Sequence, residues 1–450
     1  MTGWNGTAEK ARQTRLRNIA EAAIDDTLKD TLKKPLTYLI GLVPLAVGTA
    51  ASLISKHWAW FLVALGAYIL ALGTLLGVVL IAGRRQIPTA PLDQPLARRT
   101  PEPATDILAD LWSRTDWPFV LVGSIYLDLM IGNVPWSDLR DEEWSTLDSI
   151  RTMLGGSIIL AGRSIYSRHR ESPVLFSIVS ADQSDPLAKL TAALVAKEEW
   201  IAEGQIFELP HSGAAVTVQL HNSRDGITTM LTHRGPLPSF SWRLLERPLE
   251  EALRNGGVLY IGGFLKTGLW ANLAYHLQQL HGTLVCIDHG SIPREGEFQE
   301  ATEALRLAFR EGLVHVYFCT YGEFCALTGL RSSEGTPQHR DLARAWQNSV
   351  PAQKLPPITV VRGKDLPEHV GAYLICNGTL ETLDGPESHV NRRHVWTSSF
   401  NGHFLSQLSE LRDLDPLSAV RLATRKALDL SLQPPSDRIS SSKDHSDVIT

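Results

Sequence analysis

Cysteine is scarce in this 450-residue chain, and neither sign of charge is in large excess: there are four cysteines and a formal net charge of −5. Without a polybasic field, the composition gives no indication of a nucleic-acid partner. The cysteines lie in or beside apolar runs, which favours buried thiols in a reducing compartment. Cys319 and Cys325 are six residues apart near His315, whereas a metal site needs tighter, paired spacing.

Charge is also missing from two long apolar runs near the N-terminus. Residues 35–55 contain no Asp, Glu, Lys or Arg, and a second uncharged run extends from Trp58 to Gly83. Each run is long enough to cross a bilayer, which takes about 20 residues. Because the mean hydropathy of the chain is only −0.05, we predict two transmembrane helices over residues 35–83 rather than a buried soluble hairpin.

Basic residues flank both apolar runs and predict their orientation. Lys33 and Lys34 precede the first run, and Arg84 and Arg85 follow the second. Because positive residues favour the cytoplasmic side, we expect a plasma-membrane protein whose N-terminus and soluble domain are both cytoplasmic. The predicted parts are an N-terminal helical segment (1–34), two membrane spans (35–83), a proline-rich linker (84–105), an α/β domain (106–433) and a disordered tail (434–450).

Short β-rich runs alternate with helical patterns in the predicted α/β domain. WPFVLVGSIY, GGVLYIGGF and PITVVRG are closed by turn residues, and helical stretches such as EFQEATEALRLAFREG intervene. This alternation predicts a doubly wound, mostly parallel sheet that binds ligands at the carboxyl ends of its strands. Residues 206–235 instead alternate with period two and turn at SRDG, which predicts an antiparallel hairpin and a candidate lid.

The order of these motifs resembles the ribokinase or PfkB-type carbohydrate kinases over about residues 117 to 430. VLVGSIYLDLMIGNVP resembles the first strand of that family, LGGSIILAGR its Gly-Gly hinge, and IDHGS, CTYGEFCALTG and VVRG its nucleotide-side motifs. HVWTSSFNGHFLSQL falls where the family has D-T-T-G-A-G-D-A-F. The resemblance implies a ribokinase-like fold with a small β-lid, at about 123–135 and 206–235, that closes over a sugar-like substrate. It also implies ATP with Mg²⁺ as the phosphoryl donor.

The resemblance carries roles over to individual residues. Asp128, Gly155 and Gly156 match the substrate-binding strand and hinge, and Glu323 matches the carboxylate that holds a hydrated Mg²⁺ indirectly. Asp128 and Glu323 each have an alternative role as a strand-end or helix-cap carboxylate. For the hydroxyl residues of the last motif, Thr397, Ser398 and Ser399, the alternative role is helix capping. The predicted nucleotide- or anion-binding residues are Thr397, Ser398, Ser399, Asn401, Gly363 and Glu323.

The catalytic carboxylate of the resembling family is missing. Alignment on Phe404 puts Gly402 at the position of the catalytic Asp. Loss of a positioned base typically costs about 10²- to 10⁴-fold in rate. A register shift would bring Asn401 to this position, but an amide cannot accept a proton at neutral pH, and His403 lies roughly 100° further around the helix. We therefore predict no catalytic residue and a pseudokinase.

Three functional hypotheses follow from these residues. The leading one is a membrane-anchored, ribokinase-like pseudokinase that binds a nucleotide or a sugar- or nucleoside-like ligand as a sensor or regulator. One alternative is an active ATP-dependent sugar or nucleoside kinase with a rearranged site. The other is a membrane effector or scaffold with a regulatory soluble domain. Lid-to-lid dimers occur in the resembling family, so a homodimer through the lid is a further expectation.

Overall fold

The computed structural model describes residues 104–114, 117–132, 149–169, 172–202, 205–222, 227–290, 299–328, 356–362, 366, 370–376, 379–385 and 398–432. The chain divides into two units, residues 1–99 and 100–450, and every described residue belongs to the second. The predicted membrane spans, the tail after residue 433, Gly363 and Thr397 lie outside the described residues. Among the helices that are described, none is long and apolar enough to cross a membrane.

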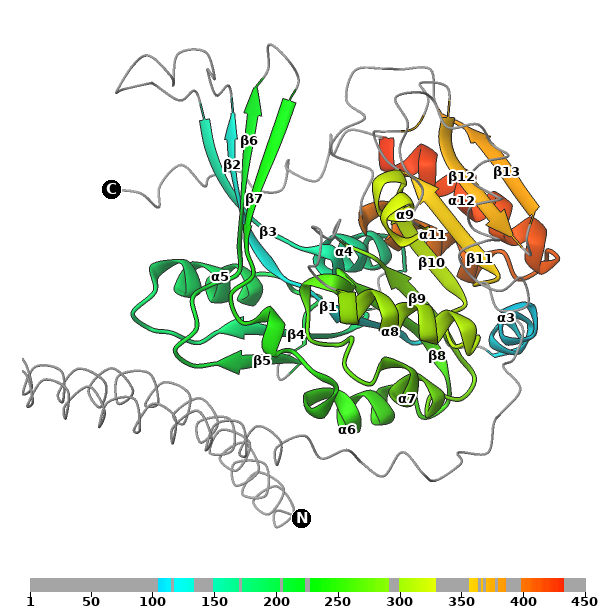
Figure 1. Ribbon diagram of the computed structural model, residues 1–450, viewed down its shortest axis with the longest axis horizontal. Helices are drawn as coiled ribbons and strands as arrows, with labels where there is room; N and C mark the ends of the chain where they lie inside the picture. The colour runs from blue at the N-terminus through cyan, green and yellow to red at the C-terminus, as the bar shows by residue number, and fades with distance from the viewer. Residues whose placement is uncertain are drawn as a thin grey trace, which may run out of the picture. The chain divides into compact units, whose positions relative to one another are not determined.

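A nine-stranded sheet forms the centre of the described domain (Figure 1). Its strands are β1 (Phe119–Gly123), β4 (Val174–Ser180), β5 (Ile206–Leu209), β8 (Gly257–Gly262), β9 (Thr283–Asp288), β10 (Val316–Thr320), β11 (Ile358–Arg362), β12 (Val370–Cys376) and β13 (Thr379–Asp384). They lie in the order β13-β12-β11-β10-β9-β8-β1-β4-β5. Pairing from β5 to β11 is parallel, and β12 and β13 add antiparallel at one edge. This confirms the predicted α/β class with a mostly parallel sheet.

Helices cover both faces of the large sheet, which explains why its central strands are buried throughout. Alternate side chains of each strand enter two hydrophobic clusters, with Val120 in one and Leu121 in the other. The first cluster contains residues of α6 (Trp242–Ala252), α7 (Leu273–Gln278), α8 (Gln299–Arg310) and α9 (Tyr321–Thr328). The second contains residues of α3 (Ala104–Trp112), α4 (Ser157–His169), α11 (Ser398–Glu410) and α12 (Pro416–Leu432).

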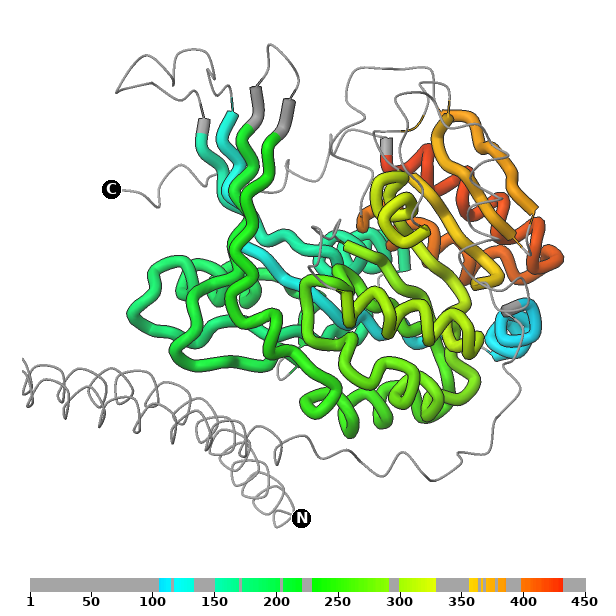
Figure 2. The backbone as a smooth tube through the Cα atoms, in the orientation of Figure 1, coloured from blue at the N-terminus to red at the C-terminus, as the bar shows by residue number. Residues whose placement is uncertain are grey.

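A four-stranded second sheet forms the lid and extends away from the large sheet (Figure 2). Its strands are β2 (Tyr126–Gly132), β3 (Ser149–Gly155), β6 (Val216–Asn222) and β7 (Ile227–His233), in the order β3-β2-β6-β7. The antiparallel pairing of β6 with β7 agrees with the predicted hairpin. A small cluster that includes Leu127 and Val216 packs the lid against α5 (Pro186–Ala196).

The lid differs from its predicted bounds in two places. Residues 206–209 form β5, which pairs in parallel with β4 at the edge of the large sheet, so this run does not belong to the lid. The lid instead gains β3, which ends at the predicted hinge. A short run with period two fits either sheet, and only its partner strand decides between them. Ile150 and Leu231 on the lid are 63% and 57% exposed, and a homodimer through the lid stays a prediction.

Candidate functional site

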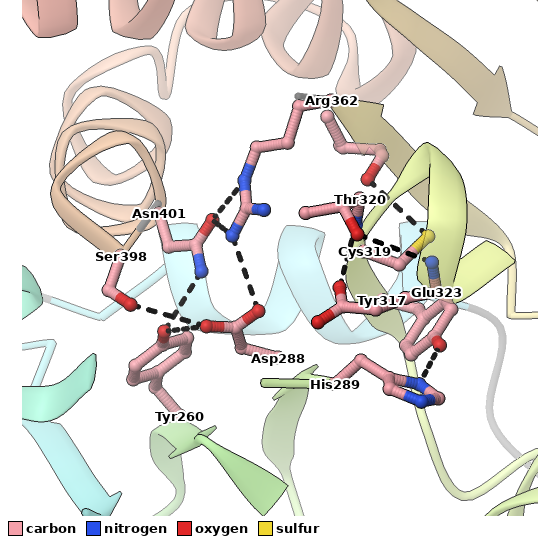
Figure 3. Close-up of polar contacts among 11 residues, drawn as sticks. Tyr260, Asp288, His289, Tyr317, Cys319, Thr320, Glu323, Arg362, Ser398 and Asn401 are labelled. Carbon is pink, nitrogen blue, oxygen red and sulfur yellow. Dashed lines mark hydrogen bonds and ion pairs between the residues drawn. The ribbon is translucent and has the colours of Figure 1, made fainter. Parts of the chain in front are cut away.

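The carboxyl ends of three parallel strands meet the first turn of α11 (Figure 3). Tyr260 comes from β8, Asp288 ends β9 and Arg362 ends β11, while Ser398 and Asn401 lie on α11. Ligand sites of open α/β sheets form at this edge because all the parallel strands end there. These five side chains, which we call the ion-pair network, are all buried.

Hydrogen bonds link the five residues of the ion-pair network into a closed set. Arg362 Nη2 lies 3.2 Å from Asp288 Oδ1 and donates to Asn401 Oδ1 at 3.0 Å, and Arg362 Nε donates to the same amide oxygen at 3.2 Å. Asn401 Nδ2 donates to Tyr260 Oη at 2.9 Å. Tyr260 Oη and Ser398 Oγ donate to Asp288 Oδ2 at 3.1 Å and 3.3 Å. Both oxygens of Asp288 and both polar atoms of the Asn401 amide therefore have partners inside the protein.

The network places an internal cation and an internal anion beside the start of α11. Burial raises the pKa of Asp288, and the Arg362 guanidinium opposes this shift. Burial also raises the pKa of Tyr260 well above its ordinary value, so this group stays a hydroxyl and a hydrogen-bond donor. A helix N-terminus favours a neighbouring negative charge. Here a carboxylate of the chain itself is bonded to Ser398, the first residue of the helix.

The predicted anion-binding residues on α11 do not share one direction. Ser398 and Asn401 point into the ion-pair network, but Ser399 Oγ lies 2.9 Å from Ser164 Oγ on α4. Successive helical residues are about 100° apart, so neighbours in this motif face different layers of the fold. The Ser399 hydroxyl is therefore directed at α4 and not at the strand ends, where an anion was expected. His403 is buried within the domain.

Gly402 contacts a neighbouring helix rather than the strand ends. A Cβ atom built on Gly402 would lie 2.3 Å from the carbonyl oxygen of Ala161 and 2.7 Å from its Cα atom. The backbones of α4 and α11 approach closely here, and no side chain fits between them. Glu410, the only acidic residue of α11, is at the other end of the helix and pairs with Arg168. No carboxylate from this helix reaches the first turn as a base.

Glu323 acts as a helix cap. The backbone N–H of Thr320 donates to Glu323 Oε2 at 2.7 Å, and the N–H of Glu323 donates to Thr320 Oγ1 at 3.2 Å. This reciprocal arrangement is a capping box that begins α9. The helix-cap alternative for Glu323 therefore describes what its carboxylate does in the fold.

The described carboxylates do not by themselves form a cage for Mg²⁺, an ion that usually keeps several waters and binds through one or two carboxylates and substrate phosphates. The ion prefers six oxygen ligands in an octahedron. Asp288 has both oxygens occupied by hydrogen bonds and an ion pair, and Glu323 has one oxygen occupied by its own helix. Within the described part of the chain, no group of three or more His, Cys, Asp or Glu side chains could hold a metal ion.

The predicted substrate residues on the lid side do come together. Asp128 lies on β2 beside the end of β3, and a Cβ atom on Gly155 would fall 2.0 Å from Asp128 Oδ2. The glycine thus makes room for the carboxylate. Gly156 has a φ of +97° and would bring a Cβ within 2.3 Å of the Ser124 carbonyl oxygen, so the hinge requires glycine. Burial raises the pKa of Asp128 to about 6, opposed by Lys266 and Arg163.

Several residues of the site were not identified from sequence. Arg362 had no assigned role, yet it is only 1% exposed and holds the ion-pair network together. Lys266 lies in η3 (Phe264–Lys266), directly after β8, with Nζ 5.1 Å from the centre of the Tyr126 ring. The signal that could have found them was a basic residue at the end of an otherwise buried strand, where this fold class binds ligands.

Solved structures share this fold at low sequence identity. Ribokinase from Thermotoga maritima has a TM-score of 0.50 and 14% identity, over 70% of this chain and 92% of that one. Ribokinase from Giardia lamblia has a TM-score of 0.52 and 12% identity, over 70% and 93%. Phosphofructokinase-2 from Escherichia coli, in complex with substrates and products, has 0.50 and 18%, over 70% and 94%. The sequence matches no family model and no curated protein. The chain therefore has the ribokinase-like fold.

Proposed function

We propose that this ribokinase-like chain is a carbohydrate-kinase homologue that binds a sugar-like ligand as a sensor or regulator and transfers no phosphoryl group. The single observation that carries the proposal is the ion-pair network, in which Arg362 and Asp288 neutralise each other beside the start of α11. The resembling family would bring an anionic phosphate to this helix start. Here the protein supplies both charges itself.

Phosphoryl transfer has three physical requirements, and what the described residues offer to each of them supports the proposal. The reaction needs N–H dipoles or cations around the moving group, a metal to neutralise its charge, and a base for the attacking hydroxyl. Arg362 is paired with Asp288 and Asn401, and the hydroxyl of Ser398 at the start of α11 donates to Asp288. The described residues contain no group of three or more His, Cys, Asp or Glu side chains that could hold a metal ion. Gly402 packs against α4 and has no room for a base.

The lid side favours a polyhydroxylated ligand over a nucleotide. Asp128 projects from the lid strand next to Gly155, and an ionised carboxylate accepts hydrogen bonds from hydroxyl groups. Its counter-charges, Lys266 and Arg163, are near enough to lower its pKa but neither forms an ion pair with it among the described residues. Asp128 therefore stays available to a ligand, unlike Asp288.

Calorimetric titration of the full chain in detergent tests this function. We expect ribose, fructose or adenosine to bind, and we expect Asp128→Asn to weaken that binding at least about ten-fold, because the substitution removes a charged hydrogen-bond acceptor. The exposed Asp413→Asn is the matched control and leaves the affinity unchanged. ATP with Mg²⁺ neither binds nor releases ADP above background. Steady turnover of any of these alcohols would overturn the proposal.

The same binding depends on pH in a predictable direction. Because the pKa of Asp128 is about 6, its carboxylate is ionised at pH 7.5 and largely protonated at pH 5, so the affinity falls as the pH drops through 6. The folded-state pKa lies above the ordinary 3.8, so protonation of this residue favours the folded state and does not cause unfolding. Asp128→Asn removes this part of the pH dependence.

We further propose that residues 35–83 anchor the protein in the plasma membrane, with its N-terminus and soluble domain in the cytoplasm. The support is the pair of uncharged runs and their basic flanks. Membranes that contain the full chain are extracted with alkaline carbonate. Two apolar spans hold the protein in the pellet, whereas release into the supernatant, as for a peripheral protein, contradicts the anchor.

A further inference from the structure

Four polar side chains gather around η3, the short turn after β8. Ser124 Oγ would lie 2.5 Å from a Cβ on Gly263, the residue before this turn. The backbone N–H of Leu265 donates to the carbonyl oxygen of His289 at 3.2 Å. Lys266 Nζ lies over the ring of Tyr126. We call Ser124, Tyr126, Lys266 and His289 the η3 cluster.

Three members of the η3 cluster have a buried polar atom without a hydrogen-bond partner. Ser124 Oγ, Tyr126 Oη and His289 Nε2 have none among the described residues, and each side chain is at least 98% buried. Leaving such a group unpaired is normally costly, and most buried polar groups in proteins are paired. The ion-pair network nearby pairs all the polar atoms of Asp288 and of the Asn401 amide. The contrast indicates that a ligand supplies the missing partners of the η3 cluster.

Lys266 adds an unpaired cation to this cluster. Its ammonium has no ion pair or hydrogen bond to any described residue, although Asp128, Asp288 and Glu323 are near enough to oppose the lowering of its pKa by burial. Asp288 and Glu323 already have closer partners of their own. A partly buried ammonium is stabilised by an anion that reaches it directly.

The cluster also adjoins Asp128. Tyr126 and Asp128 are two residues apart on β2, so their side chains leave the same face of the strand. Burial raises the pKa of Tyr126 beyond its ordinary range, so it remains a hydroxyl donor. A second positive charge, that of Arg234 just after β7, is near enough to oppose this rise in the pKa of Tyr126. The site therefore places two hydroxyl groups and two positive charges next to the carboxylate of Asp128.

We propose that Lys266 binds an anionic group, a carboxylate or a phosphate, on a polyhydroxylated ligand whose hydroxyl groups bond to Asp128. Ser124 and Tyr126 donate to the same anionic group or to the oxygens next to it. This inference rests on the proposed function, because it concerns the ligand of that same site. It makes Lys266 a specificity-determining residue.

Matched pairs of compounds test the role of Lys266 in the full chain. Gluconate has a carboxylate where glucitol has a hydroxymethyl group, and ribose 5-phosphate carries a phosphate that ribose lacks. Calorimetry should show that the protein binds the acid of at least one pair about ten-fold or more tightly than its neutral partner. The pair that shows the preference identifies the anionic group.

Two substitutions decide whether Lys266 causes the preference. Lys266→Met keeps the length of the side chain without its charge and should bring the acid to within about three-fold of the neutral compound. Lys266→Arg keeps the charge and should retain a preference. Thermal unfolding of each variant shows whether it is folded. If Lys266→Met does not fold, the affinities of the wild type and of Lys266→Arg for acid and neutral compound still test the role of the cation.

The outcomes separate this inference from the proposed function. Equal affinities for acid and neutral compound, or a preference that survives in Lys266→Met, overturn the role of Lys266. Asp128-dependent binding would then still support the proposed function. If no polyol binds at all, both proposals fail.

Discussion

Replacing Arg362 with leucine lowers the free energy of unfolding by about 3–5 kcal/mol, because the substitution leaves Asp288 buried without its counter-charge. The loss includes the two hydrogen bonds from the guanidinium to Asn401 and its position 5.9 Å from the centre of the Phe400 ring. Urea denaturation at pH 7 measures the change. We expect a midpoint shift with little change in the slope of the transition.

Two controls separate the charge effect from loss of packing. Arg247, in an exposed pair with Glu251, is the matched arginine, and Arg247→Leu changes stability by about 1 kcal/mol or less. Adding Asp288→Asn to Arg362→Leu removes the uncompensated charge and recovers most of the loss. If Arg362→Leu is as stable as the wild type, the ion-pair network does not contribute to the fold, and its proposed role in the site is wrong.

Gly402→Ala costs about 1–3 kcal/mol of stability, because the new methyl group would lie 2.3 Å from the carbonyl oxygen of Ala161. Gly402→Asp, which would restore the carboxylate of the resembling family, is more destabilising and produces no kinase activity. Chemical denaturation measures the first effect, and ADP release in the presence of sugars and ATP measures the second.

A second glycine provides the control for this prediction. The nearest atom to a Cβ on Gly213 is His233 Nε2 at 3.5 Å, an ordinary contact, so Gly213→Ala should be nearly neutral. A folded Gly402→Asp variant that phosphorylates a sugar would contradict the idea that the close packing of α4 on α11 excludes a base at this position. In that case the protein would be one substitution away from an active enzyme.

The two halves of the site differ in whether their buried polar groups have hydrogen-bond partners. At the strand ends, Arg362, Asp288 and Asn401 satisfy one another, and the described residues contain no group of three or more side chains that could hold a metal ion. Beside the lid, Ser124 Oγ and Tyr126 Oη are buried and have no partner in the described part of the chain. A fully paired polar network makes a rigid part of the core, whereas unpaired groups are stabilised when a ligand arrives. This division supports the proposal of ligand binding without phosphoryl transfer.

The sequence by itself determined the fold class and which residues meet beside the lid. Alternating β-rich and helical runs were enough to predict the mostly parallel sheet, and the strand and hinge motifs pointed to Asp128, Gly155 and Gly156, which lie together in the structure. These features depend on residues that are close together in the chain, because the period of the apolar pattern determines whether a segment forms a helix or a strand. Glycine at the hinge is likewise a local requirement, since its φ is positive.

Only the tertiary structure decided what the site can do chemically. Arg362 and Asp288 are 74 residues apart, and their pairing depends on the order of the strands. Ser399 faces α4, and Gly402 packs against Ala161, because of how two distant helices approach each other. Whether a side chain is buried, and what it contacts, depends on the helix or sheet that packs against it. A periodic pattern places a residue on an element, but it does not contain the identity of the element packed against it.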